Sequence, residues 1–162
     1  MAELLKATGI YYRNELRSIH KNGVKLQPVY EAFTNSWESI LEKYTAEHLN
    51  LGSIVIEFHY NVGMFEEDNE NNLKNLQKII ITDNGIGLNE ESFTRLLNLR
   101  DNSKSKNNKG TGRIQYLHYF DDTIFDSVYK VGDNNYRKIC LTLSKKESFL
   151  KKSCNHLHMS KK

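Results

Sequence analysis

The stretch that decides the fold lies midway along the chain and reads Ile79-Ile80-Ile81-Thr82-Asp83-Asn84-Gly85-Ile86-Gly87-Leu88. Its first half is an apolar, β-branched run, which predicts a strand. Three consecutive isoleucines cannot all face one side of a sheet, so we expect a central strand that is covered on both faces. The run ends in a carboxylate and two glycines separated by one residue. This pattern predicts a buried strand that opens into a ligand-binding turn.

The turn carries groups that recognise a flat ligand with an amine. We expect Asp83 at the edge of the core, where a carboxylate is costly unless it accepts hydrogen bonds, for example from an exocyclic amine. Gly85 and Gly87 permit a positive φ and let a flat ligand lie against bare backbone. An ordinary Asp-Asn-Gly turn after a strand explains the same residues. The stretch alone therefore leaves both interpretations open.

Composition limits the class of protein. A chain of 162 residues fits one domain with a real core. Charged residues make up 27% and hydrophobic ones 38%, an ordinary globular balance, and the net charge of +3 is too small to indicate nucleic acid. No apolar run approaches the ~20 residues of a membrane helix, and the first residues lack the apolar core of a signal peptide. With Cys140 and Cys154 in no framework spacing, we expect a cytoplasmic protein that is not bound to a membrane.

Upstream of the turn, a helix is predicted to begin at Pro28, because proline suits the first turn of a helix. Its large apolar residues recur at helical spacing and are predicted to form the buried face, namely Tyr30, Phe33, Trp37, Ile40, Leu41 and Tyr44. Glu31, Asn35 and Glu38 recur at i, i+4 and i+7 and form a second stripe. We call these three residues the polar stripe. It can polarise a water and hold a hard cation through oxygen ligands, whereas a solvated helix face is the alternative.

The other elements follow from periodicity and turn residues. Asn89 is predicted to cap a helix that ends near Arg100. The remaining predictions are a short helix over 11–20, a strand over 53–60, a hairpin loop over 66–75, a helix over 114–120, and strands over 123–130 and 136–143 around a turn at 132–135.

A polar segment over 101–109 has no apolar residue and gives way to Gly110, Gly112 and Arg113. A basic loop that ends in glycines at the start of a helix presents free backbone N–H groups, a favourable dipole and nearby cations. These are the requirements of phosphate binding, although a flexible linker gives the same composition.

The last segment, 145–162, is predicted to be a loose basic tail. Cys154, His156 and His158 stand at alternate positions within it, a spacing that suggests zinc only weakly. No second cluster completes a four-ligand site, so we interpret these residues as part of the tail.

Taken in order, three motifs resemble those of the gyrase, heat-shock chaperone, histidine kinase and MutL (GHKL) ATPase superfamily. The polar stripe resembles the N-box of that family. Asp83-x-Gly85-x-Gly87 resembles its first glycine box, and Gly110-x-Gly112 resembles its second. The order and rough separations also match, and the resemblance spans residues 28–120.

The resemblance implies the Bergerat fold. This is an α/β fold in the broad sense, built as an α+β two-layer sandwich of helices on a sheet. Its mixed, mostly antiparallel sheet is covered on one face by helices, and it binds ATP with Mg²⁺. Glu31 then resembles the general base that activates water, and Asn35 the residue whose side-chain oxygen binds Mg²⁺. Glu38 completes the box, and Asp83 resembles the carboxylate that accepts from the adenine amine, with Gly85 and Gly87 shaping its pocket.

The polar segment resembles the lid that wraps the phosphates in that family. The resemblance assigns ligand contacts there to Asn102, Lys109, Gly110, Gly112 and Arg113.

The chain departs from the family pattern at several positions, and these departures disfavour one branch of the superfamily. Glu38 stands where many members have Asp, a mild change. Histidine kinases usually have Asn at the position of Glu31 and a phospho-acceptor helical hairpin upstream, so that branch is disfavoured. Members also have a later strand whose Thr or Ser supports the adenine-binding Asp, and the candidates here, Thr142 and Ser144, lie in no convincing motif.

The domain expectation is a lead over 1–27, an ATP-binding domain over 28–144 with truncation before its last strand left open, and the tail over 145–162. No segment resembles the transducer domain that supplies a lysine to the γ-phosphate. The expected function is an ATP-binding module, an ATPase (ATP hydrolase) if it turns over, that works with a transducer, a partner chain or a second copy as a homodimer. A nucleotide-sensing or interaction module without turnover, and a structural domain unrelated to nucleotides, are the alternatives.

Overall fold

A computed structural model of the chain describes residues 3–5, 17–18, 20–21, 23–61, 76–97, 112–133, 135–144 and 150–158. The chain divides into two units, Ala32–Gly85 and Met1–Glu31 with Ile86–Lys162. We call them the hairpin unit and the sheet unit, respectively. Both contain helices with antiparallel strands, so the expected α+β class is confirmed at this level.

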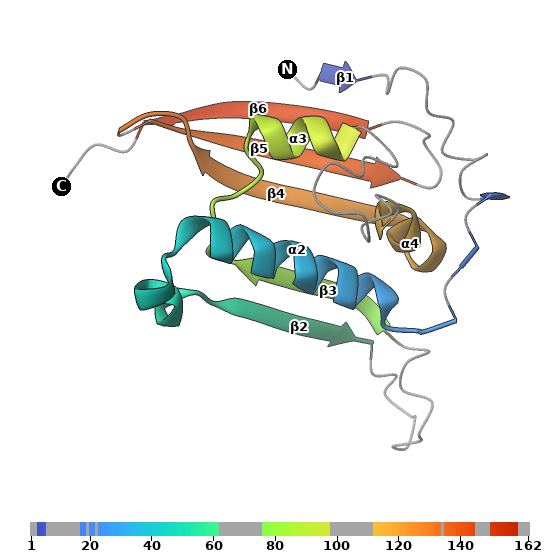
Figure 1. Cartoon of the computed structure of the whole chain (residues 1–162). Coiled ribbons are helices and arrows are strands. Elements are labelled where there is room, and N and C mark those ends of the chain that lie inside the picture. The colour runs from blue at the N-terminus through green and yellow to red at the C-terminus, as the bar shows by residue number, and fades with distance from the viewer. Residues whose placement is uncertain are drawn as a thin grey trace. The chain divides into compact units, whose positions relative to one another are not determined.

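The hairpin unit consists of two strands and a helix (Figure 1). Strands β2 (Ile54–Tyr60) and β3 (Leu76–Asp83) pair antiparallel, and Ile54 lies opposite Asp83 in the register. This confirms the hairpin predicted from the β-branched runs. Helix α2 (Gln27–Lys43), which begins in the sheet unit, continues along the hairpin, and a 3₁₀ helix (Ala46–Leu51) leads from it to β2.

The prediction that β3 is central and covered on both faces is not met. Within the described residues β3 pairs with β2 alone, and Ile79, Ile80 and Ile81 are each half-buried. Continuous apolar runs are typical of strands buried on both faces. In this two-stranded sheet the run stays partly accessible to water.

The prediction for the buried face of α2 is wrong for four of its six residues, while Ile40 is buried as predicted and Tyr44 is half-buried. Four of its large apolar residues are exposed, Tyr30 by 55%, Phe33 by 43%, Trp37 by 41% and Leu41 by 48%. The other buried residues of α2 are Pro28, Val29 and Ser36, and Ser39 is half-buried. Small side chains let α2 approach the chain closely on that side, and the bulky side chains therefore lie on another face.

The sheet unit is built on a four-stranded antiparallel sheet in the order β1-β6-β5-β4. Its strands are β1 (Glu3–Leu5), β4 (Asp122–Lys130), β5 (Asn135–Ser144) and β6 (Leu150–His158). The hairpin of β4 and β5 confirms the two strands predicted there. The prediction of a loose tail is wrong for Leu150–His158, because this segment pairs with both β5 and β1.

Helices α3 (Glu90–Leu97) and α4 (Gly112–Tyr119) supply side chains to the core of the sheet unit. The residues that are buried together are Phe93, Ile114, Leu117, Tyr129, Ile139, Leu141 and Leu143. Alternate residues of β4 and β5 contribute to this core, as expected for a sheet with one covered face. No described helix is long and apolar enough to cross a membrane.

Part of the predicted N-terminal lead packs on α4. The side chain of Gln115 donates a hydrogen bond to the carbonyl of His20 over 3.1 Å, and the hydroxyl of Tyr119 donates to the carbonyl of Val24 over 2.9 Å. The ammonium of Lys21 lies 4.1 Å from the centre of the Tyr119 ring. The helix predicted over 11–20 and the loop predicted over 66–75 lie largely outside the described residues.

Candidate functional site

Asp83 is the last residue of β3, and the chain holds its carboxylate in a defined orientation. The hydroxyl of Ser36 donates to Oδ2 over 2.8 Å, and the backbone N–H of Gly85 donates to Oδ1 over 2.9 Å. Ser36 is buried, whereas Asp83 is exposed rather than placed at the edge of a core. Each carboxylate oxygen can accept more than one hydrogen bond. Asp83 therefore keeps acceptor capacity that faces water.

Asn84 ties the turn to the segment before β2. Its Oδ1 accepts from the backbone N–H of Ser53 over 2.9 Å, and its Nδ2 donates to the carbonyl of Leu51 over 2.8 Å. The ammonium of Lys43 donates to the carbonyl oxygen of Asn84. The amide side chain thus continues the β2–β3 hydrogen bonding beyond the strand, which fixes the backbone between Asp83 and Gly85.

Gly85 has no room for a side chain. A Cβ at this position would lie 2.1 Å from the hydroxyl oxygen of Ser39 and 2.7 Å from its carbonyl carbon. The backbone of α2 thus approaches the turn directly. Ser36, Ser39 and Lys43, at i, i+3 and i+7, all contact the Asp83-Asn84-Gly85 turn from one face of the helix.

Gly87 is constrained in the sheet unit in two ways. Its φ is +78°, a value that side-chain-bearing residues rarely adopt, and a Cβ there would lie 2.3 Å from the carbonyl oxygen of Val128. The next residue, Leu88, donates its backbone N–H to the hydroxyl of Ser127 over 2.7 Å. The prediction of a positive φ is confirmed at Gly87, whereas Gly85 does not have one.

The polar stripe lies along α2 as its spacing predicts. Glu31 and Glu38 are half-buried and Asn35 is exposed. The side chain of Gln27, one turn before Glu31, donates a hydrogen bond to Oε1 of Glu31 over 2.8 Å. Asn35 directly precedes Ser36, so the stripe borders the helix face that contacts the Asp83 turn. Asn35 and Glu38 supply oxygen atoms of the kind that Mg²⁺ binds.

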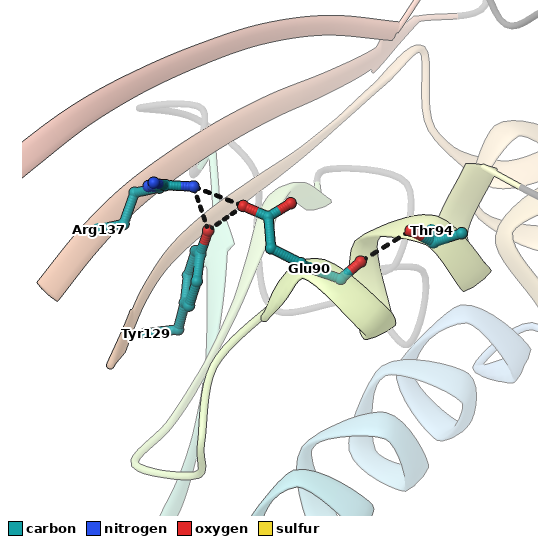
Figure 2. Close-up of polar contacts among 4 residues, drawn as sticks. All are labelled: Glu90, Thr94, Tyr129 and Arg137. Carbon is teal, nitrogen blue, oxygen red and sulfur yellow. Dashed lines mark hydrogen bonds and ion pairs between the residues drawn. The ribbon is translucent and has the colours of Figure 1, made fainter. Parts of the chain in front are cut away.

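The start of α3 carries a second polar cluster, which Figure 2 shows. Asn89 caps the helix by accepting the N–H of Ser92 over 2.8 Å, as predicted. Oε1 of Glu90 accepts two hydrogen bonds of 2.6 Å, one from the hydroxyl of Tyr129 and one from Nη1 of Arg137. We call Glu90, Tyr129 and Arg137 the Glu90 cluster.

The Glu90 cluster shifts the pKa values of Tyr129 and Arg137. Burial raises the pKa of Tyr129, the hydrogen bond to Glu90 raises it further, and Arg137 opposes this increase. The pKa of Arg137 is raised, first by its hydrogen bond with Tyr129. Nearby, the ion pair with Asp126 over 2.8 Å raises the pKa of Lys138. Nε of Arg137 is a buried atom without a hydrogen-bond partner among the described residues.

Several predicted ligand residues lie outside the described residues, namely Asn102, Lys109 and Gly110. Gly112 is the first residue of α4, so the second glycine motif does precede a helix as predicted. The backbone of Arg113 lies in the same first turn, and its side chain is outside the description. The structure thus brings Asp83 and Gly85 together with α2, and Gly87 lies against the backbone of Val128 in β4.

Sequence reasoning missed the serines that fix the turn, Ser36, Ser39 and Ser127. A usable signal was present for the first two, because they recur at i and i+3 between larger residues of α2. Small residues on one helix face indicate close approach of another backbone. Ser127 carries no comparable signal in its strand.

In comparisons with known proteins, no protein-family model, curated protein or solved structure matches the chain.

Proposed function

We propose that the chain is an adenine-nucleotide-binding module of the GHKL type, with a Bergerat-like two-layer sandwich, that binds ATP with Mg²⁺. The single observation that carries the proposal is the Asp83 carboxylate, which is exposed yet oriented by Ser36 and by the N–H of Gly85. An acceptor-only group that is held in place and open to a ligand suits the exocyclic amine of adenine. Guanine presents an acceptor at the corresponding position, so the carboxylate disfavours it.

The polar stripe supplies the other expected roles. Glu31, oriented by Gln27, is the proposed general base, and it accepts a proton from the attacking water. Asn35 is the proposed Mg²⁺ ligand, with Glu38 beside it on the helix. Mg²⁺ usually takes few protein ligands because substrate phosphates and water complete its shell, so this small oxygen set fits the ion. We expect ATP hydrolysis to be slow or to depend on a partner.

A second candidate is a purely structural turn. Two observations favour it, because the positions where Gly85 and Gly87 would carry a Cβ are occupied by Ser39 and Val128 of the same chain. On this account both glycines are required for packing, and Asp83 caps its own turn.

A binding titration with ATP, ADP and GTP, each with and without Mg²⁺, separates the two candidates. We expect ATP and ADP to raise the melting temperature and GTP to do so much less. At ligand a hundredfold above Kd the stabilisation is about 2.7 kcal/mol. The absence of any shift at millimolar nucleotide would favour the structural turn.

A further inference from the structure

Strand β4 holds the segment from Gly87 to Glu90 through three consecutive residues. Gly87 lies against the carbonyl of Val128, the N–H of Leu88 donates to Ser127, and Glu90 accepts from Tyr129. All these residues belong to the sheet unit. The end of the Asp83-x-Gly85-x-Gly87 motif and the start of α3 are therefore held by the same strand.

Packing in the core of the sheet unit fixes the position of the Tyr129 side chain. Tyr129 is only 2% exposed and belongs to the core of the sheet unit, so its hydroxyl has a defined position. Arg137 lies directly opposite Tyr129 in the β4–β5 register, and its Nη1 is 2.6 Å from Glu90 and 3.4 Å from the Tyr129 hydroxyl. Figure 2 shows the carboxylate of Glu90 pointing toward both side chains. The side chains of Arg137 and Glu90 are 32% and 56% exposed, so water screens their ion pair, whereas the bond from the buried Tyr129 is better protected.

We propose that Tyr129 and Arg137 are positioning residues that act through Glu90 to hold the Gly87 end of the glycine motif in its nucleotide-binding geometry. The inference rests on the proposed function. Asn89 links Gly87 to the start of α3, because its N–H donates to the carbonyl of Gly87 over 3.0 Å and its side chain caps α3. Loss of the cluster makes the first turn of α3 more mobile. Because Asn89 is bonded both to that turn and to Gly87, Gly87 becomes more mobile as well.

The first test uses hydrogen exchange without nucleotide. Arg137→Met removes the guanidinium and keeps an apolar stem, and Tyr129→Phe removes only the hydroxyl. Lys138→Met is the matched control, because it breaks an ion pair with Asp126 on the same two strands. We expect exchange at residues 88–93 to accelerate about tenfold in the first two variants, as local opening becomes easier, and to stay unchanged in the control. Unchanged exchange in the first two variants would overturn the proposal.

The second test measures ATP affinity at a temperature where every variant is folded. We expect Arg137→Met to weaken ATP binding by at least about fivefold, within the usual range of coupling between linked sites, and Lys138→Met to leave it unchanged. Arg137→Lys, which keeps a donor for Glu90, should recover part of the loss. A merely structural cluster would change stability and exchange without changing Kd.

The outcomes separate this inference from the proposed function. If the wild type binds ATP and Arg137→Met binds it equally well, the positioning role is overturned and the proposed function stands. If the wild type binds no nucleotide, the proposed function fails and the positioning role fails with it. Faster exchange together with weaker binding, both absent from Lys138→Met, is the result that supports the proposal.

Discussion

The hydroxyl of Ser36 on α2 donates a 2.8 Å hydrogen bond to Oδ2 of Asp83 at the end of β3. The serine is buried and the aspartate is exposed, so the donor is protected from water while the acceptor remains open to it. This contact joins the helix that carries the polar stripe to the strand that carries the carboxylate.

Ser36→Ala removes the donor that orients Asp83. We expect the free energy of unfolding to fall by about 0.5–1.5 kcal/mol, the usual net value of one hydrogen bond. ATP affinity should fall several-fold, because the carboxylate is no longer oriented before binding. Urea unfolding and an ATP titration measure the two effects. Thr34→Ala, at an exposed position of the same helix, is the control and should leave ATP affinity unchanged.

Gly87→Ala tests the backbone of the glycine motif. A φ of +78° and a Cβ at 2.3 Å from the carbonyl oxygen of Val128 make the substitution strained and crowded. We expect a loss of more than about 2 kcal/mol in the free energy of unfolding. Gly132→Ala, whose nearest neighbour would be Asn135 Nδ2 at 3.9 Å, should change it by less than about 0.5 kcal/mol. Equal urea midpoints for the two variants would contradict the described turn.

The polar stripe is tested by separating binding from turnover. Glu31→Gln keeps size and hydrogen bonding but removes the proton acceptor, so ATP should still bind while any hydrolysis falls by ~10² to 10⁴. Asn35→Ala should instead weaken the Mg²⁺-dependent part of ATP affinity, because it removes the proposed Mg²⁺ ligand. Phosphate release and titrations with and without Mg²⁺ measure both. If Glu31→Gln leaves the rate of hydrolysis unchanged, Glu31 has no catalytic role, and the polar stripe is a solvated helix face.

The raised pKa of Tyr129 predicts a pH dependence of stability. Below its ordinary pKa of 10.0 the tyrosine is neutral in both states, so its contribution to folding is fully present. As the pH rises above that value, the unfolded chain loses the proton first, and the contribution is lost on approach to the raised folded pKa. The advantage of the wild type over Tyr129→Phe in urea unfolding should therefore be constant below about pH 9 and shrink as the pH rises above about 10. An advantage that grows over this range would contradict the assigned cluster.

Local patterns predicted most elements because they depend on nearby residues. The β-branched runs predicted β2 and β3, Asn89 predicted the cap of α3, and the turn residues over 132–135 predicted the hairpin of β4 and β5. Each of these signals is a property of one segment or of two neighbouring segments.

Predictions failed where distant packing decides. The aromatic stripe of α2 has the stronger hydrophobic pattern, yet close approach of the helix to Gly85 requires small residues such as Ser36 and Ser39 on the contact face. The strand β6 was missed because its polar, basic sequence looks like a tail, and its pairing with β5 and β1 supplies the order that local pattern lacks.

The sequence predicted the ligand-facing residues of the candidate site better than the residues that hold them in place. The motif spacing identified Asp83 and the glycines, and the positive φ was correct at Gly87 alone. Ser127 and the Glu90 cluster come from strands distant in sequence, and no spacing rule connects them to the turn.

The central claim is that Asp83 accepts a hydrogen bond from adenine. Its most direct test is the ATP affinity of Asp83→Asn, which keeps the shape of the side chain but replaces one acceptor oxygen with an NH₂ donor. Asp133→Asn, at an exposed position in the turn between β4 and β5, is the control. We predict that Asp83→Asn stays folded and raises the Kd for ATP roughly tenfold to a hundredfold, while Asp133→Asn leaves it unchanged. An unchanged Kd in folded Asp83→Asn would show that the carboxylate only caps its turn.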